Sequence, residues 1–194
     1  EPDFREESLR IEGGLSHILS DTLNGAAGLA YQDSDTRNGL GQRTLEHLFL
    51  PVSLTHDTRD DDLDAKRGFY ADLDVTPFAG LDNGSAGARV YGDLRGYTSF
   101  GENERFTFAA RGQLGVLSGA TATQIPSEML FFSGGAGTVR GQSYQSLGVP
   151  VTPTRQVGGR SFAALSAELR AAVADKWQVV GFADGGFVAA SDDF

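Results

Sequence analysis

The sequence contains no cysteine, and this absence excludes several kinds of site. Without thiols the chain has no disulfide framework, no thiolate zinc site and no thiol nucleophile. Lysine is also scarce, with only Lys66 and Lys176 present. Because 16 Lys and Arg residues stand against 26 Asp and Glu residues, the formal charge is −10. Such a chain, with no basic stripe, is not expected to bind nucleic acid, since phosphate binding needs clustered cations.

Long apolar runs are missing as well. No window approaches the roughly 18 consecutive apolar residues of a membrane-spanning helix. The start, Glu1-Pro2-Asp3-Phe4, shows neither an initiator methionine nor the pattern of a signal peptide. We therefore expect a processed or excised piece of a longer protein. No linker or shift in composition divides the 194 residues, so we expect one folded unit, residues 1–194.

The dominant pattern is strand periodicity, in which apolar and polar side chains alternate along segments of about ten residues. Clear segments are 46–55, 69–76, 88–95, 106–116 and 162–171, and weaker ones are 9–18, 23–32, 141–147 and 177–188. Turn signals between them include Asp21, Asn24-Gly25 and Asp82-Asn83-Gly84. The pattern predicts an all-β, antiparallel chain of about nine strands.

Two stretches interrupt the alternation. Residues 55–67 are densely charged, and residues 117–141 are rich in Gly, Ser and Thr. Long loops in a compact domain are usually functional or disordered, so both are candidate functional segments.

An alternating all-β chain is either a soluble sandwich or barrel, or a membrane barrel whose apolar face meets lipid. Several segments here are longer than the usual five or six residues and match the 9 to 11 that cross a bilayer. Charges also lie on the face opposite the apolar one, where a wet lumen tolerates them better than a dry core. These charges are Arg89, Asp93, Arg111, Glu168 and Arg170. Length and charge favour the membrane barrel, although periodicity alone fits both.

The acidic run from Asp57 to Asp64 suggests a calcium loop, because hard cations bind clustered carboxylates. The template fails, however. With Asp60 as the first ligand, Ala65 stands where the turn glycine belongs and Ala71 where the closing glutamate belongs. We expect a solvated loop in which Arg59 and Arg67 pair with the carboxylates, and no metal site.

Other catalytic and cofactor patterns are missing too. The glycines near Gly134 do not form a dinucleotide fingerprint, because Arg140 replaces its third glycine. The three histidines are scattered, and no Gly-x-Ser-x-Gly elbow occurs. We therefore predict that the chain is not an enzyme and carries no cofactor.

Three charged residues, Arg140, Glu168 and Asp184, could have a structural role rather than a catalytic one. Glu168 shares the polar face of its segment with Arg170, and Asp184 lies in the next segment. Arg140, on the long loop, could reach a lumenal carboxylate and form a bidentate contact. In the alternative, each charge only meets water in the lumen.

Three motifs carry a resemblance. Residues 131–141 join Gly134-Gly135 to Val139-Arg140-Gly141, with Gln142 where an aromatic is usual and Tyr144 nearby. The second motif combines Asp57-Thr58-Arg59-Asp60 with Arg67-Gly68-Phe69. The third combines Ala167-Glu168-Leu169-Arg170 with Phe182-Ala183-Asp184-Gly185-Gly186.

These motifs resemble those of the outer-membrane barrels of the BamA and TamA insertases and their two-partner-secretion relatives, the bacterial surface antigen family. The second motif is closest in form to TamA. The resemblance implies a sixteen-stranded barrel of the bacterial outer membrane, preceded by POTRA domains that this chain lacks. Residues 1–194 would form part of its C-terminal barrel, covering roughly strands six to fourteen.

The resemblance also implies a mechanism. Arg140 would anchor the loop-six-like segment 117–141 to Glu168 and Asp184 inside the barrel. A weakened seam would offer strand edges to client outer-membrane or secreted proteins by β-augmentation. Implied partners are membrane lipid, POTRA domains and an inner-membrane component, as in a translocation and assembly module. Alternatives are a two-partner-secretion transporter, a passive pore, or a soluble all-β binding module.

Overall fold

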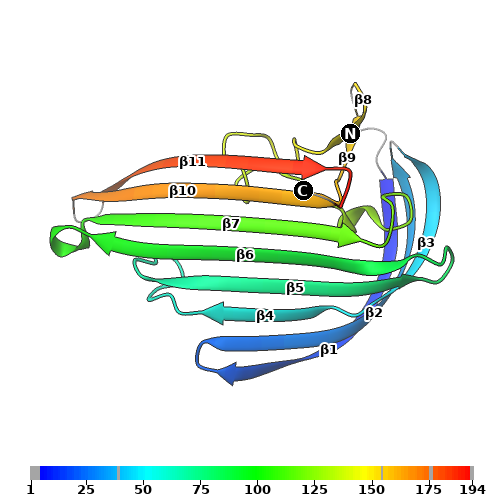
Figure 1. Cartoon of the computed structure of the whole chain (residues 1–194), viewed down its shortest axis with the longest axis horizontal. Coiled ribbons are helices and arrows are strands. Elements are labelled where there is room, and N and C mark those ends of the chain that lie inside the picture. Colours follow the sequence, from blue (N-terminus) through cyan, green and yellow to red (C-terminus); the bar gives the residue numbers. More distant parts are fainter. Residues whose placement is uncertain (1–4, 39, 154, 175–176, 193–194) are drawn as a thin grey trace.

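The computed structural model describes residues 5–38, 40–153, 155–174 and 177–192, and most of them belong to one antiparallel sheet of nine strands (Figure 1). This confirms the predicted all-β fold. The sheet strands are β1 Arg5–Ser20, β2 Leu23–Asn38, β3 Gly41–Phe49, β4 Val52–Asp57, β5 Gly68–Gly80, β6 Ala86–Phe100, β7 Phe106–Ser118, β10 Ser161–Ala174 and β11 Trp177–Ala189. A separate hairpin pairs β8 Val149–Thr152 with β9 Arg155–Val157.

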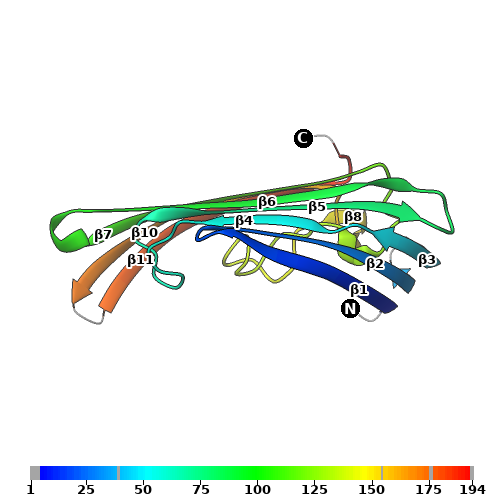
Figure 2. The same ribbon diagram turned by 90° about the horizontal axis from the view of Figure 1, so that it is seen from below.

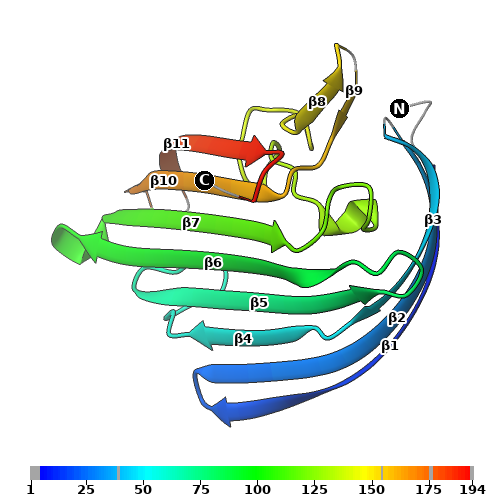
Figure 3. The same cartoon turned by 45° about the vertical axis from the view of Figure 1, so that its right-hand side comes forward.

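The strands follow one another across the sheet in the order β1-β2-β3-β5-β6-β7-β10-β11, and β4 continues the line of β3 between β2 and β5. Within the described residues, β1 and β11 form the two edges of the sheet. Figure 3 shows the sheet bending into a trough, with β1 to β3 curving upward along the right-hand side past the ends of β5 to β7. No helix among the described residues is long and apolar enough to cross a membrane.

The outer face of the trough is apolar and exposed. Leu94, Leu114 and Leu165 are 58%, 59% and 70% exposed and lie on neighbouring strands. In the described part of the chain, the other sheet is the short β8–β9 hairpin, which is too small to cover this face. The alternation therefore does not come from a two-sheet sandwich.

The inner face holds the buried core. After β7 the chain enters the trough as an inner loop, residues 119–148, which lies on the concave side of the sheet (Figure 2). Apolar side chains from the first part of this loop pack against inward-facing side chains of the sheet. The buried cluster consists of Ala30, Phe49, Phe78, Leu117, Ala120, Ile125, Met129, Leu130, Phe131, Phe162 and Ala164.

Three details differ from the sequence-based predictions. The predicted strand 141–147 is wrong, because this segment forms turns and a bend, with Gly141 at φ 86° and Gln145 at φ 52°, and ends in a single bridge from Leu147 to Ser133. The predicted turn at Asn24-Gly25 is also wrong. Both residues lie in β2 and pair with β1, and the chain reverses at residues 21–22. Finally, Pro51 has no N–H to donate, and the predicted strand 46–55 is split there into β3 and β4.

Candidate loop-anchoring site

The tip of the inner loop is a tight turn built on glycines. Gly134 and Gly135 have φ values of 100° and 92°, a region that side-chain-bearing residues rarely adopt. The N–H of Gly135 donates to the carbonyl oxygen of Val139 at 3.1 Å, and the N–H of Thr138 donates to the carbonyl of Gly135 at 3.2 Å. This turn presents Arg140 to strands β10 and β11.

Asp184 of β11 holds Arg140 through three hydrogen bonds. The guanidinium Nε donates to Oδ2 at 2.8 Å and Nη2 donates to Oδ1 at 2.8 Å. The backbone N–H of Arg140 also donates to Oδ2, at 2.9 Å. Because the Asp184 side chain is only 2% exposed, this bidentate contact is largely shielded from water.

Glu168 and Ser166 of β10 complete the set around Arg140. Nη1 of the guanidinium pairs with Oε2 of Glu168, and Nη2 donates to the Ser166 hydroxyl at 2.9 Å. The Ser166 hydroxyl in turn donates to Asp184 at 2.6 Å. The guanidinium also lies 3.8 Å from the ring centroid of Phe182. Hydrogen bonds from Arg140 to Asp184, and next to Glu168, raise the pKa of the guanidinium further above its usual value.

The tip of the inner loop packs closely against Gly186 of β11. A Cβ atom at Gly186 would lie 2.5 Å from Oγ of Ser133 and 2.7 Å from Cγ2 of Val139. Both distances are shorter than ordinary van der Waals contacts, so a side chain at this position would push the tip off the strand. Gly141, which the sequence analysis also singled out, has room for a side chain, because no atom lies within 4 Å of its Cβ position. Its role in the turn comes instead from its positive φ of 86°.

Arg111 of β7 is a further contact of the tip that the sequence did not reveal. Its Nη1 donates to the carbonyl oxygen of Gly137 at 2.8 Å, while Nε and Nη2 bond Asp93 at 2.9 and 2.6 Å. The sequence placed Arg111 and Asp93 only on the polar face. The strand register pairs Arg111 with Ser166 and thereby brings it beside the site, a signal that needs the register to be known.

The first part of the inner loop is held by apolar packing. Phe131 stacks on Phe162 with centroids 5.8 Å apart, and the guanidinium of Arg89 lies 4.3 Å from the Phe131 ring centroid. A Cβ at Gly115 would come within 2.5 Å of the Phe131 ring. The inner loop is therefore attached twice, through an apolar root, residues 119–132, and a polar tip, residues 133–147.

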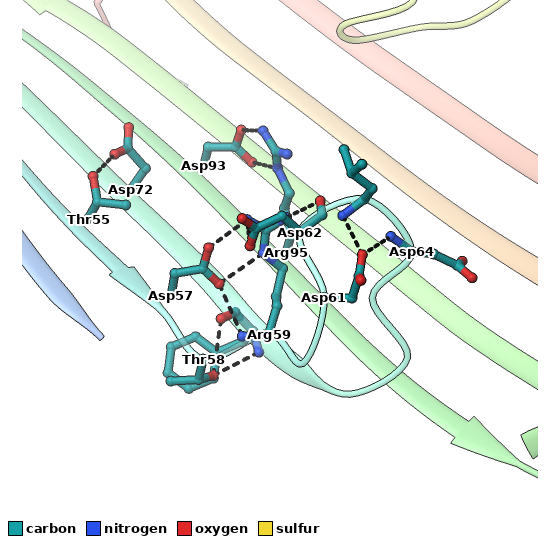
Figure 4. A network of polar contacts seen from close by, with 12 residues as sticks. Thr55, Asp57, Thr58, Arg59, Asp61, Asp62, Asp64, Asp72, Asp93 and Arg95 are labelled. Carbon is teal, nitrogen blue, oxygen red and sulfur yellow. Dashed lines mark hydrogen bonds and ion pairs between the residues drawn. The ribbon is translucent and has the colours of Figure 1, made fainter. Parts of the chain in front are cut away.

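The second motif folds the loop between β4 and β5, residues 58–67, which we call the hairpin loop. Figure 4 shows Asp57 and Arg59 facing each other, and their contacts are 2.9 Å from Nε and 2.5 Å from Nη2. The Arg59 guanidinium also lies 5.0 Å from the ring centroid of Tyr70. These contacts fix the first residue pair of the motif at the end of β4.

Asp60 closes the hairpin loop. Its Oδ1 accepts the backbone N–H groups of Lys66 at 2.9 Å and Arg67 at 3.1 Å. These bonds lower the pKa of Asp60, so their contribution is present above the usual carboxyl pKa and is lost as the pH falls through the lowered value. Arg67 pairs with Glu104 rather than with an acid of its own loop, which corrects the expectation of purely internal pairing. Among the described residues, no cluster of three or more Asp, Glu or His side chains is arranged so that it could hold a metal ion.

Gly68 tests how tightly the hairpin loop is closed. Its φ is 91°, and a Cβ would lie 2.2 Å from the carbonyl oxygen of Thr58. We expect Gly68→Ala to destabilise the loop by about 2 kcal/mol through backbone strain and this clash. Protease cleavage within residues 58–67 measures the change.

Gly84→Ala is the matched control, because Gly84 also has a positive φ, 67°, but no atom lies within 4 Å of its Cβ position. Gly84→Ala should destabilise its own loop, between β5 and β6, by about 1 kcal/mol, through backbone strain alone. Equal effects of the two substitutions would show that the approach of Thr58 is unimportant.

A curved antiparallel sheet with an exposed apolar outer face and charged residues on its inner face is typical of the wall of a membrane β-barrel. Residues 2–193 match the Omp85 superfamily domain. The chain belongs to this superfamily, which confirms the resemblance to barrels of the BamA and TamA type.

A solved structure supports the fold. The crystal structure of BamA from Haemophilus ducreyi lacking POTRA domains 1–3 superposes with a TM-score of 0.81 at 16% identity. The match covers 95% of this chain and 42% of the BamA chain, so the present chain spans less than half of that protein. No match was found among the curated proteins.

Proposed function

We propose that this chain is part of the wall of a bacterial outer-membrane barrel that inserts or translocates other proteins without covalent chemistry. Membership of the Omp85 superfamily and the likeness to BamA support this function. The exposed apolar face supports it too, because a row of leucines on neighbouring strands suits contact with membrane lipid. Residues 1–194 would then be part of a C-terminal barrel domain.

The anchored tip of the inner loop is the observation that carries the proposal. Arg140 donates hydrogen bonds to Asp184, Glu168 and Ser166 on two adjacent strands. A loop held in this way braces the inside of the wall and fixes β10 relative to β11. In this proposal Val139-Arg140-Gly141 is the anchoring triplet, Gly134 and Gly135 shape its turn, and the two carboxylates receive it.

The barrel would work through a lateral seam outside this segment of the wall. A client strand would pair with an exposed strand edge there, since β-augmentation supplies backbone hydrogen bonds without specific side chains. The clients would be outer-membrane or secreted proteins. POTRA domains and an inner-membrane component would be the protein's other partners.

Reconstitution of the whole protein in liposomes tests this function. We expect an unfolded outer-membrane β-barrel client to fold faster in these liposomes than in empty ones, with folding followed by heat-dependent gel mobility. Equal rates would contradict the insertion function. Export of one dedicated substrate without client insertion would instead identify a two-partner-secretion transporter, and ion conductance alone would identify a passive pore.

A further inference from the structure

Arg170 joins the two motifs of the inner face into one network. Its Nε donates to Oε1 of Glu168 at 2.6 Å, and Oε2 of the same carboxylate pairs with Arg140. Its Nη1 lies 3.4 Å from Oδ1 of Asp64 in the hairpin loop. A continuous chain of charges therefore runs from the hairpin loop to the tip of the inner loop.

The geometry around Glu168 explains why Arg170 matters for Arg140. The carboxylate has two oxygens, and each is bound by a different arginine. Without Arg170, the free oxygen would lose its partner and the carboxylate could rotate away from Arg140. The side chains of Arg170 and Glu168 are only 18% and 15% exposed, so water replaces the lost bond poorly.

The hairpin loop is held where it can act on Arg170. Ala65, next to Asp64, is only 3% exposed, and the carbonyl of Lys66 accepts a hydrogen bond from the Ser99 hydroxyl at 3.0 Å. Tyr97, on the same strand as Ser99, lies 5.8 Å from the Arg170 guanidinium. Tyr97, Arg140, Glu168 and Arg170 line one cavity of about 190 Å³, so the tip of the inner loop borders the same space as Arg170.

We propose that Arg170 is a positioning residue that couples the hairpin loop to the anchoring of the inner loop. Displacement of residues 58–67 withdraws Asp64 from Arg170, so that the guanidinium loses one of the two carboxylates that orient it and holds Glu168 less firmly against Arg140. The coupling acts in both directions, because the coupling free energy between two sites is the same whichever site is changed. Release of the inner-loop tip should therefore also loosen the hairpin loop. This inference rests on the proposed bracing role of the inner loop.

Thiol labelling tests the coupling, since the 194 residues contain no cysteine. Ser133→Cys places a reporter in the tip at a side chain that is 1% exposed and whose Oγ has no hydrogen-bond partner. Ala65→Cys places a second reporter in the hairpin loop. The labelling rate of the reporter in the folded protein, measured in detergent micelles, reports how often each loop opens.

We expect Asp64→Asn to raise labelling at position 133 by about two- to fivefold, the effect of losing a partly exposed ion pair. Arg170→Gln should raise it by about tenfold, because a hydrogen bond to a charged group is lost. Arg170→Lys, which keeps the charge, should restore part of the protection. In the Arg170→Gln background, Asp64→Asn should have no further effect.

Asp62→Asn is the matched control. Asp62 lies in the same loop with its side chain 84% exposed, and it contacts Arg59 rather than Arg170. Equal labelling with Asp62→Asn and Asp64→Asn would overturn the coupling, as would an Asp64→Asn effect that persists without Arg170.

Arg140→Ala separates this inference from the bracing role. It should raise labelling at both reporters. If it raises labelling at position 133 but neither Asp64→Asn nor Arg170→Gln does, only the coupling through Arg170 fails. If it leaves position 133 protected, the bracing role itself fails.

Discussion

Arg140→Ala should release the tip of the inner loop. It leaves the Asp184 carboxylate, 2% exposed, without the cation that binds both of its oxygens. Breaking a buried ion pair from one side costs about 3 to 5 kcal/mol. We expect Arg140→Ala to weaken the attachment of the tip by about 3 kcal/mol, the low end of this range, because the arginine side chain is 28% exposed to water.

Protease sensitivity of residues 133–147 and client assembly by the whole protein measure this effect. Both should change together if the tip braces the wall. Arg140→Lys is the graded control, because lysine keeps the charge but cannot form the bidentate contact. It should fall between the native protein and the alanine variant. Unchanged protease protection together with unchanged assembly would refute the bracing role.

Gly186→Val should displace the same tip while leaving Arg140 and both carboxylates in place. The new side chain would occupy the space now filled by Ser133 and Val139. Because the clash is with the packed tip, we expect a loss of about 2 kcal/mol in tip attachment, within the range for overpacking. Faster protease cleavage in residues 133–147 would report the displacement.

Gly185→Val provides a closely matched control. Gly185 is the neighbouring residue on β11 and has no atom within 4 Å of its Cβ position. Side chains of successive strand residues point to opposite faces, so the added valine would face away from the inner loop. Equal sensitivity of both variants to protease would mean that valine disturbs β11 itself rather than the seat of the tip.

The strands could be predicted because their signal is local. Leu165 and Leu169 alternate with Glu168 and Arg170, and the structure exposes the leucines at 70% and 45% while it turns the two charges inward. Alternation of this kind follows from strand geometry alone. The break at Pro51 was not predicted, although the missing N–H gives a physical reason for it.

The contacts of the site depend on pairings between distant residues, which local patterns do not encode. Arg67 pairs with Glu104 and Arg170 contacts Asp64, across 37 and 106 positions of sequence. Arg111 reaches the tip only because β7 lies beside β10 in one particular register. By contrast, the expectation that Arg140 would lie near Glu168 and Asp184 came from the motif resemblance and not from the periodicity.

The double attachment of the inner loop determines which part of it can move. Rings such as Phe131 and Phe162 hold the root by stacking, which depends on buried apolar area and responds little to salt. Charged groups hold the tip, and their attraction weakens as salt screens the exposed members. We therefore expect added salt to loosen the tip before the root, and to act through the more exposed partners of the tip rather than through the shielded contact between Arg140 and Asp184.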